Sequence, residues 1–98
     1  MGKKANKLKT VFLNGTEIAE MADVHRVFAE ELKFPATYGN NLDALYDLLT
    51  EPREAIILLR DQALLREALG ERYDALMQVL RDAAEENPRI ILLEEEDA

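Results

Sequence analysis

The run Ala55-Ile56-Ile57-Leu58-Leu59, in the middle of a 98-residue chain, is entirely apolar and shows no alternation with polar residues. A short run of this kind is typical of a β-strand that is covered on both faces, as in a parallel sheet. Ile90-Ile91-Leu92-Leu93 has the same character and predicts a second such strand. Thr10-Val11-Phe12-Leu13, which ends at Asn14-Gly15, predicts a third buried strand.

Between these strands lie four segments with the spacing or the end signals of helices. They span residues 22–33, about 41–49, 63–70 and 71–86. Asn40 or Asn41 can cap the second helix, and Asp23 suits the positive amino end of the first. Pro35, Gly70 and Asn87-Pro88 mark helix ends.

The order is therefore strand, two helices, strand, two helices, strand. Strands joined by helical crossovers run parallel, with right-handed connections. We predict an α/β domain with a three-stranded parallel sheet and four helices over residues 10–93. Residues 1–9 are expected to be a flexible basic tail, and residues 94–98 a charged, acidic tail that blocks further strand pairing.

Composition narrows the class of protein. The chain has no cysteine, which excludes disulfides, thiol catalysis and zinc–thiolate sites. No apolar run approaches the ~20 residues that span a bilayer, and no secretory signal is visible. The glycines are isolated, so no phosphate-binding loop is present. We expect a cytoplasmic protein without a membrane segment, a cofactor or a metal site.

Charge points to the kind of partner. The formal net charge is −8, and four lysines but no acids fall in the first ten residues. Residues 11–98 then carry 8 basic and 20 acidic residues, a net charge of −12. Such a body repels nucleic acid and attracts basic proteins. The alternative is that the acids serve only solubility.

The acids are placed with regularity on two of the helices. Asp43 and Asp47 are four residues apart and share one side of the second helix, and Tyr46 lies next to its apolar edge. Asp82 and Glu86 repeat this spacing on the fourth helix. If the two helices are neighbours, the four carboxylates form one acidic face around Tyr46. Simpler explanations remain open, because Asp43 suits the helix dipole, Tyr46 can be a packing residue and the late acids can be a solvated face.

The segment Tyr38-Gly39-Asn40-Asn41-Leu42-Asp43-Ala44-Leu45-Tyr46-Asp47 resembles the barstar family. The family pattern there is a Tyr-Gly pair, a polar residue, Asn-Leu-Asp-Ala-Leu, an aromatic residue and Asp. Further similarity lies in the opening strand ending in Asn-Gly, in the segments 23–25, 32–35 and 78–83, and in the last apolar strand. The resemblance covers roughly residues 10–93.

The resemblance implies an intracellular inhibitor of a basic, secreted, guanyl-preferring ribonuclease of the barnase type, built as an α/β protein with three parallel strands and four helices. The second helix and the loop before it would plug the active site of the enzyme, with Asp47 in the place of a substrate phosphate. The partner-binding residues that it implies, together with their neighbours in the motif, are Thr37, Tyr38, Gly39, Asn40, Asn41, Leu42, Asp43, Ala44, Tyr46, Asp47, Asp82 and Glu86.

The chain also departs from the family. Tyr46 stands in place of tryptophan, Thr37 in place of a tyrosine that packs against the enzyme, and Leu48 in place of cysteine, while Asp82 is one methylene shorter than the family's glutamate. The loss of an aromatic contact at position 37 removes a group of the sort that carries binding energy. A related ribonuclease or a toxin domain is therefore as good a target as barnase, and the protein could serve self-protection or toxin immunity, as in a toxin-antitoxin pair.

Two other classes of function are compatible with a small acidic domain. Carboxylate pairs can serve acid–base catalysis or hold a hard metal ion. His25 is the only histidine, is expected to face solvent and has no partner signature, and no nucleophile motif appears, so we predict no enzyme. The remaining alternative is an interaction module with the same fold and another basic partner. The free protein is expected to be a monomer.

Overall fold

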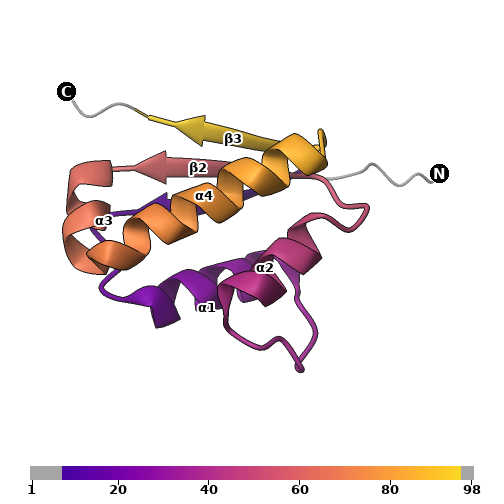
Figure 1. Ribbon diagram of the computed structural model, residues 1–98, viewed down its shortest axis with the longest axis horizontal. Coiled ribbons are helices and arrows are strands. Elements are labelled where there is room, and N and C mark those ends of the chain that lie inside the picture. The colour runs from indigo at the N-terminus through magenta and orange to yellow at the C-terminus, as the bar shows by residue number, and fades with distance from the viewer. Residues whose placement is uncertain (1–7, 96–98) are drawn as a thin grey trace.

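A three-stranded sheet with four helices is seen in the computed structural model, which describes residues 8–95 (Figure 1). In chain order the elements are β1 (Lys9–Asn14), α1 (Met21–Leu32), α2 (Leu42–Leu49), β2 (Ala55–Arg60), α3 (Gln62–Leu69), α4 (Glu71–Glu86) and β3 (Ile90–Glu94). The predicted fold class is confirmed, and each element begins and ends within about one residue of the expected position. None of the helices in this part of the chain is long and apolar enough to cross a membrane.

The ends of the sheet reach slightly further than predicted. Lys9 belongs to β1 and Glu94 to β3, although both were assigned to the tails. Of the remaining residues of the two predicted tails, Leu8 and Glu95 are exposed. Residues 1–7 and 96–98 lie outside the described residues.

The strands lie in the order β1-β2-β3, and both neighbouring pairs are parallel. The register places Val11 beside Ile57 and Ile57 beside Leu92. Side chains alternate between the two faces of a strand. One face of the sheet is buried beneath the helices and forms the core with them, through Val11, Leu13, Ala55, Ile57, Leu59 and Ile90.

The other face of the sheet is not covered by any described element. Phe12 is 48% exposed, Ile91 43% and Leu93 46%. The prediction that these apolar strands are covered on both faces is therefore wrong. The reason is topological: both crossovers step in the same direction across the sheet, so right-handed connections place their helices on the same side.

Local capping fixes the starts of the helices that carry the sequence motif. The Asn41 side-chain oxygen accepts a hydrogen bond of 2.8 Å from the Ala44 backbone N–H, so Asn41 is the cap of α2. At the start of α1, the Asp23 carboxylate accepts from the backbone N–H groups of Ala19 at 2.9 Å and Glu20 at 3.2 Å. Asn41 is one of the two caps that the sequence predicts for α2. Asp23 lies in the first turn of α1, as predicted, and it also accepts backbone hydrogen bonds there.

Asn87, just beyond α4, joins three parts of the fold. Its side-chain amide nitrogen lies 3.0 Å from the carbonyl oxygen of Leu49, and 3.1 Å from those of Glu51 and Arg53. Its side-chain oxygen accepts from the Arg89 N–H at 3.1 Å. The residue is buried, with 7% of its surface exposed. One amide group thus ties the end of α4 to the end of α2 and to the segment that enters β2.

We expect Asn87→Ala to lower the free energy of unfolding by about 2–3 kcal/mol, because buried carbonyl oxygens lose their donor. Urea denaturation followed by circular dichroism measures the change. Asn87→Asp is the matched control, since it keeps the size of the side chain but cannot donate at neutral pH. It should destabilise at least as much as alanine. An unfolding midpoint that does not change in either variant would show that the amide contributes nothing.

Candidate functional site

A hollow of about 540 Å³ lies between α2 and α4 and is lined by Leu42, Asp43, Tyr46, Asp47, Val79 and Asp82. The two helices are packed against each other (Figure 1). The three carboxylates therefore converge on one depression beside an aromatic ring, as the spacing in the sequence predicted for neighbouring helices. We call the set Asp43, Tyr46, Asp47, Asp82 and Glu86 the acidic face.

The orientation of α2 explains how its two acids reach the surface together. Leu45 and Leu49 are fully buried in the core, and Tyr46 is partly buried against it. Asp43 and Asp47, which are one helical turn apart, are exposed. The helix thus has one side anchored in the core and an adjacent side that presents carboxylates to solvent.

The two acids of α4 that were predicted for the acidic face do not both reach the hollow. Asp82 lines the hollow and accepts a hydrogen bond of 2.9 Å from the Gln78 side-chain amide, which holds its carboxylate in place. Glu86 is exposed one turn further along and does not line the hollow. Arg81 points away from this side, as predicted, and pairs with Glu94 of β3 at 3.3 Å.

The negative charge of the acidic face is not compensated within residues 8–95. None of its four carboxylates takes part in the ion pairs found there. Arg53, at the far end of α2, is turned away: its guanidinium donates to the carbonyl oxygens of Leu48 at 2.9 Å and Leu32 at 3.2 Å. No group of three acidic or histidine side chains in the same residues is placed to hold a metal ion. The arrangement suits recognition of a cationic surface.

The loop before α2 mixes exposed and inward-facing residues. Thr37, Gly39, Asn40 and Asn41 are exposed, and Ala44 is partly buried on the helix that follows. The Asn41 side-chain amide donates to the Gly39 carbonyl oxygen at 3.3 Å, and a Cβ on Gly39 would lie 2.9 Å from that amide nitrogen. Glycine at this position therefore lets the loop close tightly onto the helix cap.

Tyr38 is turned inward instead of presenting its ring to solvent. Its hydroxyl lies 2.7 Å from Nδ1 of His25, and its ring meets Phe34 edge-on at 4.8 Å between centroids. His25 is only 5% exposed. The prediction of a solvent-facing histidine is therefore wrong: the side chain joins α1 to the loop that positions α2. Burial raises the pKa of Tyr38 to about 12.

Two further hollows lie in the described part of the chain, and one of them borders the acidic face. One, of about 420 Å³, is lined by Met21, Ala22, His25, Asn40, Asn41, Leu42 and Arg72. It adds Arg72, a cation from the first turn of α4, to the exposed asparagines of the loop. This placement of Arg72 has no signal in the sequence, because Arg72 and the loop are distant along the chain and meet only through the packing of α4.

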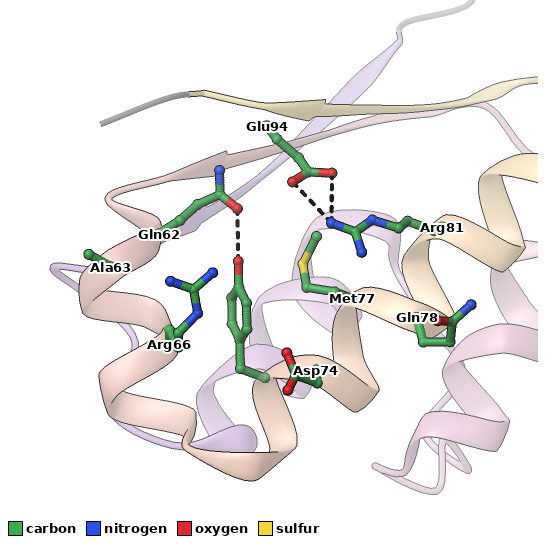
Figure 2. A pocket seen from close by; sticks show the side chains of 9 residues that line it. Gln62, Ala63, Arg66, Asp74, Met77, Gln78, Arg81 and Glu94 are labelled. Carbon is green, nitrogen blue, oxygen red and sulfur yellow. Dashed lines mark hydrogen bonds and ion pairs between the residues drawn. The ribbon is translucent and has the colours of Figure 1, made fainter. Parts of the chain in front are cut away.

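Another hollow, of about 740 Å³, lies between α3 and α4 and is separate from the acidic face (Figure 2). Several of its charged and polar groups pair with one another. The Arg66 guanidinium stacks 4.8 Å from the centre of the Tyr73 ring, and the Tyr73 hydroxyl donates to Gln62 at 2.8 Å. Arg81 meets Glu94 across the same hollow. This internal pairing distinguishes it from the unpaired carboxylates on α2.

Comparison with known proteins places the chain beside one family and a relative from Bacillus subtilis. Residues 8–96 match the family model described as "Barstar (barnase inhibitor)". A Bacillus subtilis (strain 168) protein named "Putative ribonuclease inhibitor YrdF" is 28% identical over 81 residues, which cover 81% of this chain and 89% of that protein. The family match spans both helices of the acidic face, the loop before α2 and all three strands.

The buried His25 predicts a dependence of stability on pH. Burial lowers the pKa of His25 from its ordinary value of 6.5. The unfolded chain then binds the proton more tightly, so the stabilisation is complete above about pH 6.5 and declines as the pH falls through that value. Urea midpoints measured at about pH 7.5 and pH 5.5 should show the decline. His25→Gln, which can still bond to Tyr38 but does not titrate, should remove most of it. An equal decline in both proteins would assign the effect to carboxylates.

Proposed function

The chain belongs to the barstar family, a family of inhibitors and not of enzymes, and on this premise we propose that it blocks the active site of a basic, guanyl-preferring microbial ribonuclease inside the cell. The observation that carries the proposal is the hollow in which Asp43, Asp47 and Asp82 lie around Tyr46 without a neutralising cation among the described residues. A surface of this kind complements an enzyme that concentrates cations to bind phosphate.

Asp47 takes the place of a substrate phosphate in this proposal. A carboxylate accepts charge-assisted hydrogen bonds from arginine and histidine side chains in much the same way as a phosphate oxygen does. Asp47 is exposed on a helix whose neighbouring residues Leu45 and Leu49 are fully buried. The carboxylate is therefore offered from a rigid support, which reduces the conformational entropy lost on binding.

The other members of the acidic face have supporting roles. Tyr46 offers a partly buried ring with a polar end, the kind of side chain that fills a pocket at the centre of an interface. Asp43, Asp82 and Glu86 surround it with negative charge that accelerates encounter with a basic enzyme. The barnase–barstar pair is itself the reference example of such electrostatic steering.

A second target class is favoured by one observation, the small exposed Thr37 at the position where the family has a tyrosine. A missing aromatic contact at the edge of the interface suits a partner of different shape. The second candidate is therefore an immunity protein or interaction module that binds another basic toxin domain through the same acidic face. Inhibition assays against a panel of guanyl-type ribonucleases and basic toxin domains separate the two functions.

Asp47→Ala should weaken inhibition of a barnase-like ribonuclease more than any other single substitution. We expect at least a 30-fold rise in the inhibition constant, which corresponds to the ~2 kcal/mol minimum for truncating one partner of a buried charge pair. Tyr46→Ala should be next in effect, and Glu86→Ala milder, because Glu86 lies outside the hollow. Titration of ribonuclease activity measures all three.

The matched control is Glu67→Ala, which removes one exposed carboxylate from α3, away from the acidic face. It should leave the inhibition constant within about twofold of the starting protein. Equal effects of Asp47→Ala and Glu67→Ala would reduce the role of Asp47 to net charge. Inhibition by the unaltered protein that Asp47→Ala does not weaken would contradict the assignment of the anchor residue.

Ionic strength gives an independent test. The association rate constant should fall by at least about tenfold between roughly 50 mM and 500 mM NaCl, because salt screens the field of exposed charges. Stopped-flow fluorescence of the mixed proteins measures it. An association rate that does not respond to salt would argue against steering by the acidic face.

A further inference from the structure

The uncovered side of the sheet carries a continuous apolar patch, formed by Phe12, Ile56, Leu58, Ile91 and Leu93, which we call the outer sheet face. Phe12, Leu58 and Leu93 share one row across the three strands, and Ile56 and Ile91 share the next. The side chains of the two outer strands are between 43% and 48% exposed. All four helices contribute to the opposite, buried face or pack on it (Figure 1).

A bare apolar face is unusual for a parallel sheet, since such sheets are nearly always covered on both sides. Contiguous apolar patches that cross several elements mark association sites. The helix layer separates this patch from the acidic face, so a ribonuclease held at the acidic face leaves it free. We propose that the outer sheet face binds the same face of a second copy of this chain, forming a two-fold symmetric dimer.

The charges at the rim of the outer sheet face select a second copy as the occupant. Glu54 and Arg89 are exposed immediately before β2 and β3, and neither has an ion-pair partner within residues 8–95. At the other end of the same two strands lie Arg60 and Glu95, which pair with each other at 3.1 Å. Strands β2 and β3 therefore each have opposite charges at their two ends.

This pattern is self-complementary. A two-fold axis that lies in the interface and crosses the strands reverses their direction in the second copy. Glu54 then faces the second copy's Arg60, and Arg89 faces the second copy's Glu95. Between these ends, apolar rows face apolar rows. In the dimer, the two charges without an ion-pair partner in each chain, Glu54 and Arg89, thus lie against the Arg60–Glu95 pair of the second copy.

Net charge supports the same occupant. The chain as a whole carries −8, so two copies repel each other over most of their surface. The four charged residues Glu54, Arg60, Arg89 and Glu95 at the rim of the outer sheet face sum to zero, so two copies that meet through this face avoid a net repulsion between these rim charges.

The size of the patch sets the strength of the contact. Three strands of five or six residues cover roughly 15 Å by 20 Å. That is less than the ~800 Å² per partner of a standard stable interface. We therefore infer a reversible dimer with a dissociation constant on the order of 10–100 µM, which replaces the expectation of a monomer at high concentration.

Sedimentation equilibrium of the full chain at about 5 to 500 µM tests the proposal. The average mass should rise from 11.1 kDa towards twice that value. Ile91→Lys places an ammonium group in the centre of the contact and should weaken dimerisation at least tenfold. This variant also lowers the net negative charge, so general repulsion does not explain the loss. Circular dichroism checks that the variant is folded.

Arg89→Glu tests the charge pattern, because it sets two carboxylates against each other at the rim. Its matched control is Lys33→Glu, which makes the same change in net charge at the exposed end of α1. Only Arg89→Glu should raise the dissociation constant by more than about threefold. A mass of 11.1 kDa at every concentration overturns the proposal, as does dimerisation that is unaffected by Ile91→Lys. Binding of the monomer to phosphatidylcholine vesicles through this patch overturns it in favour of a lipid surface.

Discussion

The side-chain amide of Asn87 is the contact on which the placement of the acidic face depends. It holds carbonyl oxygens at the end of α2 and at the entry to β2, while its own backbone ends α4. Helix α2 has only eight residues, too few to be stable in isolation. Its direction is set at one end by Asn87 and at the other by the Asn41 cap and by Tyr38 resting on His25. The carboxylates inherit their positions from these three polar contacts.

The topology of the sheet divides the molecule into two surfaces with different chemistry. Because both crossovers return over the same side, all helical surface and most negative charge lie on that side, and apolar strand surface is left on the other. In the proposed function, one surface meets a cationic enzyme while the second is available for a neutral contact. The two surfaces share the buried core but no exposed residue.

The sequence predicted those features that depend on local pattern. The order of elements, the Asn41 cap, the role of Asp23 and the clustering of Asp43 and Asp47 all follow from spacings of a few residues. A continuous apolar run predicts a strand, but it does not show whether helices cover one face of the sheet or both. Likewise, nothing in the residues around His25 discloses that Tyr38, thirteen residues away, encloses it.

Contacts between distant segments were the part that local reasoning missed. The sequence around Asn87 predicts only the end of a helix before a proline. The hydrogen bonds of its side-chain amide reach carbonyl oxygens 34 to 38 residues earlier in the chain. Arg72 was not expected beside the loop for the same reason. Asp82 was expected as part of an acidic face, whereas the Gln78 amide that fixes its carboxylate was not.

The unpaired carboxylates between α2 and α4 have a consequence for the free protein. Like charges one turn apart or across a hollow repel each other, so the fold carries an electrostatic strain that disappears once a cationic partner is bound. If the acidic face binds the enzyme as we propose, part of the binding free energy comes from the relief of this repulsion. Salt then has opposite effects on two properties: it screens the repulsion and stabilises the free protein, while it slows association with the enzyme. A substitution that neutralises one of these acids would raise the stability of the free protein and lower its affinity for a cationic partner. The two properties therefore cannot both be improved at these positions.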